Sequence, residues 1–377
     1  MKKVLHLVTK SSFGGAQKYV LDLAESLQDE YEQLVVYGAN SFGGPETFKE
    51  QLQKLDVMPV FIPSMDRDVS VGKELTSFRT LYGLLKRERP NVLHVNSAKA
   101  AGLGALAGRM VGTKKIIYTV HGLALSEDRP LVQKAFIAMF SWITFMLSHR
   151  IIFVSHKEFS HVQSWPRVSK KSVVIHNGIQ NIEFIKREES RRLLEKKINQ
   201  SCAGKFLIGG IGELNTNKGM TYLLQALEQG NLKNTIYVHW GTGELEEGLK
   251  EEIQKRGLKD QIFLLGFDVG AKKYLRGLDL FVLPSIKEGL GYVLLEAGQA
   301  NLPVIASNTG GIPEIIKHQS TGLLVTPKDI SGWTQAICDI RSHPEISKEL
   351  ASNLYTHVHE NFSLESMVSK TKKVYES

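Results

Sequence analysis

Cysteine is scarce in this sequence, and no apolar run is long enough to span a membrane. The 377 residues include two cysteines, Cys202 and Cys338, which are too few for a disulfide framework and suit small buried side chains in a reducing compartment. The longest apolar segment, Leu131–Leu147, is interrupted by polar residues and falls short of the ~20 residues that a spanning helix needs. The apolar run Val4–Val8 is too short for the core of a secretory signal. We therefore expect a cytoplasmic protein that does not span the membrane.

Motifs for metal ions and nucleic acids are also missing. No cluster of cysteine and histidine has the spacing of a metal site, and basic residues do not alternate with aromatic ones. The hydrophobic fraction of 42% and the charged fraction of 23% are those of a globular protein, and the length allows about two domains. The net charge of +8 favours anionic partners such as phosphorylated ligands or an acidic membrane leaflet. A basic, solvated surface without a partner would carry the same charge.

Alternating β-rich and helical segments form the main pattern of the chain, and the pattern begins twice. The first half predicts strands at Val4–Thr9, Gln33–Gly38, Met58–Ile62, Val92–Asn96, Ile116–Val120, Ile151–Ser155 and Val173–His176. The second half predicts strands at Phe206–Ile211, Ile236–Trp240, Ile262–Gly266, Leu280–Pro284, Val304–Ser307 and Gly322–Val325. Helices are predicted between them, among others at Ala16–Gln28, Leu75–Arg87, Met220–Gln229, Glu345–Glu360 and Leu364–Tyr375. This alternation is typical of parallel α/β sheets with both faces covered.

The polar segment Arg187–Ser201 separates the two halves, and we expect a solvated helix there, at the domain boundary. The predicted domains are residues 1–180 and residues 181–361, and the last helix, residues 362–377, is expected to pack back on the first domain. Each domain would be an α/β, doubly wound unit. Two such units facing each other would leave a cleft between the carboxyl ends of their strands, where these sheets bind ligands.

The segment from Glu288 to Glu296 carries the clearest chemistry. A predicted buried strand ends at Pro284, and a loop with two glycines leads into a helix from about Gly291. Free backbone amides at a helix start favour a phosphate group. Two carboxylates beside a phosphate are better suited to accept hydrogen bonds from hydroxyl groups, such as those of a sugar and a ribose. The alternative is that Glu288 caps the helix and Glu296 lies on the surface, and spacing alone does not decide between these interpretations.

The pair Glu288 and Glu296, eight positions apart, resembles the paired glutamates of the retaining glycosyltransferases of family four. These enzymes have two Rossmann-like domains facing across a cleft, the GT-B fold. Further matches occur in the same order along nearly the whole chain, at Phe13-Gly14-Gly15-Ala16-Gln17, Val120-His121-Gly122, His176-Asn177-Gly178-Ile179, Asn217-Lys218-Gly219, Gly241-Thr242-Gly243, Pro303-Val304-Ile305-Ala306 and Gly310-Gly311-Ile312-Pro313-Glu314. Each motif is weak alone, and the ordered set is specific.

The resemblance implies a role for each matching residue in the second half. Glu288 would face hydroxyl groups of the transferred sugar close to its anomeric carbon, and Glu296 would hold the ribose. The segment that contains Gly289, Leu290, Gly291, Tyr292 and Val293 would contact the diphosphate through backbone amides.

Lys218, at the start of a predicted helix, is disfavoured there by the helix dipole, and we interpret it as a contact to the departing diphosphate. Glu213 departs from the family pattern, because many members carry an arginine there that contacts the diphosphate. An ionised acid cannot take that role, so Lys218 should carry more of the neutralisation.

Two motifs in the first half have weaker roles. The loop with Gly14 and Gly15 would lie beside the donor phosphates, although an ordinary strand-to-helix turn would look the same. His121 would contact the donor sugar, whereas a lone histidine is more often structural, as we expect for His94. The apolar helix Leu131–Leu147 fits a core helix or an interfacial surface, and we favour the core.

The resemblance implies a hexosyltransferase-type enzyme that moves a sugar from a nucleoside diphosphate, expected to be UDP, to an acceptor hydroxyl with retained configuration. No metal ion or other cofactor is expected. The acceptor would be a saccharide or a polyprenyl-linked glycan of the cell envelope or an exopolysaccharide, met in peripheral contact with the inner face of the membrane, and no nucleic acid would bind. The alternatives are a nucleotide-sugar epimerase, which the two glutamates disfavour, and a non-catalytic nucleotide-sugar binder, which Glu213 suggests.

Overall fold

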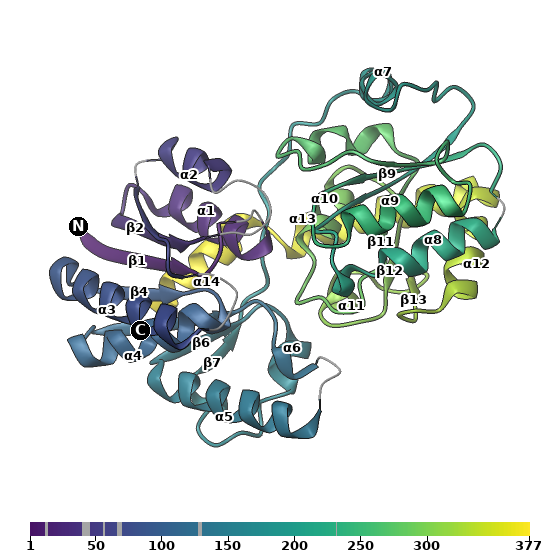
Figure 1. Ribbon diagram of the computed structural model, residues 1–377. Coiled ribbons are helices and arrows are strands. Elements are labelled where there is room, and N and C mark those ends of the chain that lie inside the picture. The colour runs from purple at the N-terminus through teal and green to yellow at the C-terminus, as the bar shows by residue number, and fades with distance from the viewer. Residues whose placement is uncertain (12–13, 40–45, 56, 66–69, 127–129, 231) are drawn as a thin grey trace. The chain divides into compact units, whose positions relative to one another are not determined.

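The computed structural model describes residues 1–11, 14–39, 46–55, 57–65, 70–126, 130–230 and 232–377. The chain forms two compact units, one of residues 1–178 with 364–377 and one of residues 179–363. Each unit contains one sheet of parallel strands with helices packed around it (Figure 1). Two α/β units with parallel sheets confirm the predicted fold class.

The first unit has a seven-stranded sheet in the order β3-β2-β1-β4-β5-β6-β7, in which every neighbouring pair is parallel. Its strands are β1 (Lys2–Val8), β2 (Tyr31–Gly38), β3 (Met58–Ile62), β4 (Val92–Val95), β5 (Lys115–Val120), β6 (Arg150–Phe153) and β7 (Ser172–Val174). The inner strands are buried and mostly apolar because both faces of the sheet are covered, and His6, His94 and Thr119 are buried polar residues among them.

Helices cover the two faces of this sheet in separate sets. The helices of the unit are α1 (Gly15–Leu27), α2 (Glu46–Gln53), α3 (Val71–Glu88), α4 (Ala98–Val111), α5 (Leu131–Leu147), α6 (His156–Ser160) and α14 (Leu364–Glu376), with short turns η1 (Ala124–Ser126) and η2 (Ser169–Lys171). Helix α1 contacts α2 and α14, whereas α4 contacts α3 and α5. The winding therefore reverses between β1 and β4.

The C-terminal helix α14 packs on the first unit through the side chain of Tyr375. Its hydroxyl lies 2.6 Å from Nδ1 of His94, and Nε2 of His94 lies 2.7 Å from the hydroxyl of Thr119. Lys115 also donates to the carbonyl oxygen of Tyr375 at 3.0 Å. The return of the last helix to the first domain is confirmed, and His94 has the structural role that we expected.

The second unit has a six-stranded parallel sheet in the order β10-β9-β8-β11-β12-β13. Its strands are β8 (Phe206–Ile211), β9 (Thr235–Trp240), β10 (Ile262–Leu264), β11 (Leu280–Leu283), β12 (Val304–Ser307) and β13 (Leu323–Val325). Its helices are α7 (Arg187–Ile198), α8 (Met220–Gln229), α9 (Glu246–Lys255), α10 (Tyr292–Gln299), α11 (Ile312–Ile315), α12 (Ile330–Ser342) and α13 (Pro344–Asn361), with turns η3 (Thr216–Lys218) and η4 (Ala271–Gly277). Here the winding reverses between β8 and β11.

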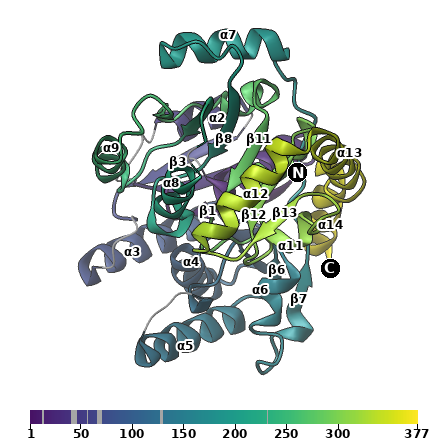
Figure 2. The ribbon, with the colours of Figure 1, turned by 90° about the vertical axis from the view of Figure 1, so that its right-hand side faces the viewer.

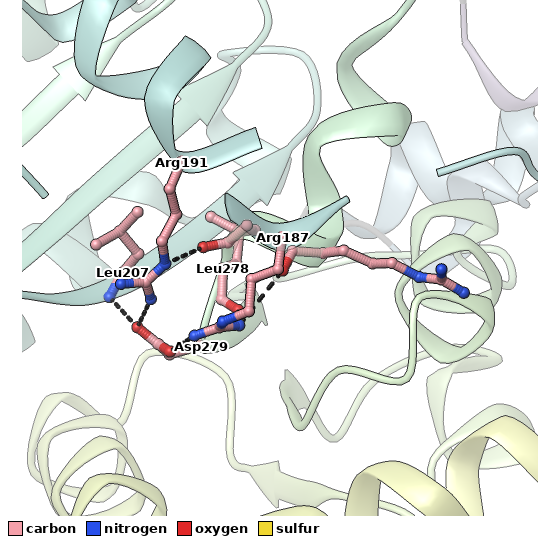
Figure 3. A network of polar contacts seen from close by, with 7 residues as sticks. Arg187, Arg191, Leu207, Leu278 and Asp279 are labelled. Atoms are coloured by element: carbon pink, nitrogen blue, oxygen red, sulfur yellow. Dashed lines mark hydrogen bonds and ion pairs between the residues drawn. The ribbon is translucent and has the colours of Figure 1, made fainter. Parts of the chain in front are cut away.

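Helix α7, which we expected as a solvated boundary helix, is fastened to the second unit by Asp279 (Figure 3). The carboxylate of Asp279 accepts from Arg191 at 2.6 Å and from the backbone amide of Leu207 at 2.7 Å, and it also pairs with Arg187. The side chain of Leu194 in α7 is fully buried. The helix is solvated along its charged side, as expected, while Arg187, Arg191 and its apolar side face the unit.

Helix α5 is not the core helix that we favoured. Of its seventeen residues, only Thr144 and Phe145 are buried, although most of the others are apolar. Among the described residues, no helix is long and apolar enough to cross a membrane. Phe145 joins the core of the unit, with Met146 and Leu147 packed against it, whereas Leu131, Phe136, Met139 and Phe140 are exposed.

Two fully enclosed histidines, His6 in β1 and His239 in β9, are held in the neutral form. Burial lowers the pKa of His6 to about 4, against a raising effect of its hydrogen bond to Gln33. Burial likewise lowers the pKa of His239 to about 4. In the unfolded chain both would titrate near ~6.5.

We predict that the protein loses stability as the pH falls from about 7 to about 5. Between ~6.5 and ~4 the unfolded chain binds protons at His6 and His239 that the folded chain does not, so acid favours unfolding by about 2 kcal/mol per histidine at pH ~5. Denaturant unfolding followed at both pH values measures the loss. A His239→Asn variant should show a shallower pH dependence than the wild type, and equal slopes would contradict the assignment.

Candidate active site

The candidate site of the second unit lies where the winding reverses. Glu213 and Lys218 follow β8, and Glu288 follows β11, the strand that pairs with β8. Since the carboxyl ends of neighbouring parallel strands meet at one edge of the sheet, these loops lie side by side. This is the place in an open α/β sheet where ligands bind.

Lys218 and Glu288 form an ion pair across the two loops. Nζ of Lys218 lies 2.6 Å from Oε2 of Glu288, and the hydroxyl of the buried Ser285 donates to the same oxygen at 3.2 Å. Both charged side chains are mostly but not fully buried, with exposed fractions of 23% and 16%. A charge-assisted contact in such surroundings is stronger than a surface pair, and part of both side chains remains accessible to solvent.

The backbones of the two loops also touch. The amide of Ile286 donates to the carbonyl of Asn217 at 2.7 Å. Gly219 has a φ of +66°, and a Cβ at this position would lie 2.1 Å from the carbonyl oxygen of Pro284. Only glycine fits this approach, which holds the preceding residue, Lys218, next to the β11 loop. The Asn217-Lys218-Gly219 motif therefore has a steric basis.

A third loop supports the backbone of Glu288. Gly310, with a φ of +53°, would place a Cβ 1.7 Å from the carbonyl oxygen of Glu288, and the amide of Gly311 donates to that oxygen at 3.3 Å. The hydroxyl of Thr309 donates to the carbonyl of Ile286 at 3.0 Å. The motif at 310–314, expected to order the loop beside the donor, lies directly against Glu288.

Helix α10 begins after an N-cap glycine, which has no side chain to cap the first backbone amides. Gly291 is the N-cap residue, and Leu290 and Tyr292 beside it are buried, whereas Gly289 and Val293 are partly exposed. Backbone amides at a helix start and the positive end of the helix dipole suit an anion.

Glu296, the fifth residue of α10, is buried with 6% of its surface exposed. This burial excludes the alternative that Glu296 lies on the surface. Glu213 is partly exposed in the loop after β8, and the next amide, that of Leu214, donates to the carbonyl of Thr242 at 3.0 Å. The contact explains the Gly241-Thr242-Gly243 motif as a support of this loop.

His239 is a site residue that the sequence analysis missed. Its Nε2 lies 2.9 Å from the carbonyl oxygen of Gly212, which can only accept, so Nε2 carries the hydrogen and Nδ1 accepts from the hydroxyl of Tyr237 at 2.8 Å. The positive charge of Lys218 adds to the burial that lowers the pKa of His239. A neutral histidine thus fixes the end of β8. His239 lies near the carboxyl end of a predicted strand, and this position was the signal in the sequence that could have identified it.

The first unit has its own candidate residues at the point where its winding reverses. Gly14 is the N-cap of α1 and Gly15 its first residue, while Phe13 of the same motif lies outside the described residues. A cavity of about 380 Å³ lies at the ends of β1 and β4, and its lining includes Gly15, Lys10 and Lys99. The glycine loop therefore borders an open cavity with basic side chains.

His121 follows β5 in the first unit. Its Nε2 lies 3.4 Å from Oδ1 of Asn96, whose amide nitrogen donates to the carbonyl of His94 at 3.1 Å. The ring of Tyr19 stands edge-on at 5.0 Å. Burial lowers the pKa of His121 to about 3, so the ring is neutral near neutral pH. It can exchange hydrogen bonds with a ligand but supplies no charge.

Two family models match the chain, one in each unit. The model described as Glycosyltransferase Family 4 matches residues 13–181, and the model described as Glycosyl transferases group 1 matches residues 192–357. These matches include the glycine loop and His121 in the first case, and Lys218, Glu288 and Glu296 in the second.

Curated relatives and solved structures agree with these matches. The chain is 28% identical to the UDP-Gal:alpha-D-GlcNAc-diphosphoundecaprenol alpha-1,3-galactosyltransferase of Escherichia coli, over 99% of this chain and 96% of that enzyme. It is 23% identical to the capsular polysaccharide biosynthesis glycosyltransferase CapM of Staphylococcus aureus, over 86% and 87%. The crystal structure of Anabaena HepE in complex with UDP-glucose shares the fold, with a TM-score of 0.84, 21% identity and full coverage of both chains. The chain belongs to the family-4 type of glycosyltransferases, with one family model on each of its two units.

Proposed function

We propose that this glycosyltransferase moves a sugar from a UDP-sugar to a hydroxyl group of a lipid-linked saccharide, and that the sugar keeps its anomeric configuration. The observation that carries the proposal is the ion pair of Lys218 and Glu288 beside the N-terminus of α10. These contacts bring together a cation, a helix N-terminus and a carboxylate that can accept hydrogen bonds from hydroxyl groups. A nucleoside diphosphate sugar needs all three for binding.

In this proposal the diphosphate binds at the start of α10, from Gly289 to Val293, and forms an ion pair with Lys218 in place of Glu288. Glu288 is then released to accept hydrogen bonds from the sugar, and Glu296 accepts from the ribose. The leaving diphosphate gains negative charge in the transition state, where the cation and the helix amides stabilise it most. Its departing oxygen helps to take the proton of the acceptor hydroxyl on the same face of the sugar, so no protein nucleophile is required.

Glu213 and the first unit have secondary roles in the same proposal. Glu213 is acidic where a diphosphate contact would need a cation, so it either points away from the donor or contacts a hydroxyl group of the donor or of the acceptor. His121, neutral near neutral pH, would hydrogen-bond the donor sugar. The loop at Gly14 and Gly15 would approach the phosphates with its backbone.

The nature of the acceptor rests on the relatives. The E. coli relative, which matches nearly the whole chain, is named for a galactosyl transfer to a GlcNAc-diphosphoundecaprenol. A lipid-linked acceptor in cell-envelope or exopolysaccharide assembly would place this enzyme in the cytoplasm at the inner face of the membrane. Transfer from UDP-galactose to a GlcNAc-diphospholipid is the first reaction to test, beside UDP-glucose, GDP-mannose and ADP-glucose as alternative donors.

Removal of the cation should slow the reaction. Lys218→Met is expected to lower kcat/KM by about tenfold to over a hundredfold, because one charge-assisted hydrogen bond is worth about 1.5–3 kcal/mol. Lys250→Met is the matched control, since Lys250 pairs with Glu246 and Glu247 on α9 of the same unit. Nucleotide release in steady state measures both variants. Near-normal turnover of Lys218→Met would refute the assigned role.

Glu288→Gln should lower kcat while nucleotide binding persists. Because Lys218 and Glu288 act as one pair, the double variant should lose less than the product of the two single losses. If the wild type binds nucleotide but releases none from any donor with any acceptor, the chain is a non-catalytic binder. Release of a rearranged donor without an acceptor would instead identify an epimerase.

Metal removal should leave the reaction unchanged. The charge of the leaving diphosphate is met by Lys218 and by the dipole of α10, so a divalent cation has no assigned role. Activity after dialysis against EDTA is expected to equal that of the untreated enzyme. A strong loss that Mg²⁺ or Mn²⁺ restores would overturn the metal-independent mechanism.

A further inference from the structure

Helix α5 exposes an apolar stripe on one side. Val132, Phe136, Met139, Phe140 and Ile143 are all exposed, with 57% for Phe136 and 61% for Phe140. At 3.6 residues per turn, these five positions fall within about 100° of the helix circumference. In Figures 1 and 2, α5 lies along the lower edge of the first unit. The neighbouring helix α4 exposes two further apolar side chains, Leu106 and Met110.

Lys134 and Ser141 of α5 lie on the side opposite the stripe, whereas Gln133 is exposed and Phe145, on the inner side, is fully buried. Lys134 and Ser141 are partly buried and Thr144 is buried, while the hydroxyl of Thr144 donates to the carbonyl of Phe140 at 2.9 Å. Helices on a protein surface normally turn their polar side to water. Helix α5 instead leaves large apolar side chains uncovered, and such patches mark interaction sites.

Cations gather at the C-terminal end of the helix. Arg109 donates to the carbonyl of Leu147 at 2.6 Å, and Lys171 donates to the carbonyl groups of Met146 and Ser148, both at 3.0 Å. Burial lowers the pKa of Lys171 most, and the positive charges of Arg109 and Arg167 lower it further.

The charge bias extends beyond this cluster. Residues 98–178 contain eleven Lys and Arg but only three Asp and Glu. The apolar stripe therefore lies in a segment of positive charge.

We propose that the exposed face of α5 is the surface by which this chain docks on an anionic lipid bilayer. The inference rests on the proposed function, because docking on a bilayer would bring the enzyme to a lipid-linked acceptor. A helix of seventeen residues spans about 25 Å, less than the ~30 Å hydrocarbon core, so α5 would lie along the interface with Phe136 and Phe140 among the acyl chains. The cations at its end would meet the lipid phosphates.

Charge argues for lipid as the occupant rather than a second copy of the chain. A symmetric dimer through α5 would place the same surface of both copies together and confine their positive charges near one interface. An acidic bilayer neutralises the same charges and covers the apolar stripe at once. Both features of the surface thus fit one partner.

Sedimentation of the full chain with lipid vesicles tests this proposal. The wild type should bind vesicles that contain phosphatidylglycerol, bind pure phosphatidylcholine more weakly, and lose binding as salt is raised. Phe136→Gln combined with Phe140→Gln should reduce the partition coefficient at least about tenfold. Ile346→Gln, which changes an exposed apolar residue of α13 in the other unit, should leave it unchanged. The thermal unfolding midpoint of the double variant should equal that of the wild type, which would show that the double variant is folded.

Several outcomes would overturn the proposal. The first is that the wild type does not bind phosphatidylglycerol vesicles. The second is that the double variant binds them as tightly as the wild type does. The third is that the wild type is a dimer, that the double variant is a monomer, and that neither binds lipid. Because the assay uses neither donor nor acceptor, failure of sugar transfer in a chain that still binds vesicles would refute only the proposed function. Transfer to a water-soluble acceptor should be equal in the wild type and the double variant.

Discussion

The ion pair between Lys218 and Glu288 joins the two loops on which the candidate site depends. It forms at the edge of the second sheet where the winding reverses, and backbone contacts at Gly219 and Gly310 hold both partners in place. Lys218 neutralises Glu288 beside a helix start that attracts anions. A bound diphosphate would compete for the cation, so binding of the donor and release of Glu288 for the sugar would be coupled events.

Neutral buried histidines support the strand ends in both units. His239 holds the carbonyl of Gly212 at the end of β8, while His94 joins Tyr375 of the last helix to Thr119 of β5. Burial keeps these rings uncharged because a cation in the core would lose its hydration without a compensating partner. Their hydrogen bonds order the loops without adding charge beside the candidate site.

The strands and the glutamate motif could be predicted from the sequence because each depends on local information. Continuous apolar runs define buried parallel strands, and the observed strands lie within a few residues of the predicted ones. Glu288, Lys218 and Gly310 could be named from motifs. His239 could not, since its role comes from a carbonyl on a neighbouring strand. The attachment of helix α7 could not be predicted either, because Arg187 and Arg191 pair with Asp279, which lies far along the chain.

The sequence by itself determined two α/β units, the family, and the residues that meet at the second sheet edge, since apolar periodicity and ordered motifs depend on neighbours along the chain. Only the tertiary structure decided that Lys218 is paired with Glu288 and which side of α5 faces outward. A helix that is apolar nearly all round has no dominant polar side to orient it. Its orientation follows from contacts with α4 and with Arg109 and Lys171, and these leave Phe136 and Phe140 exposed.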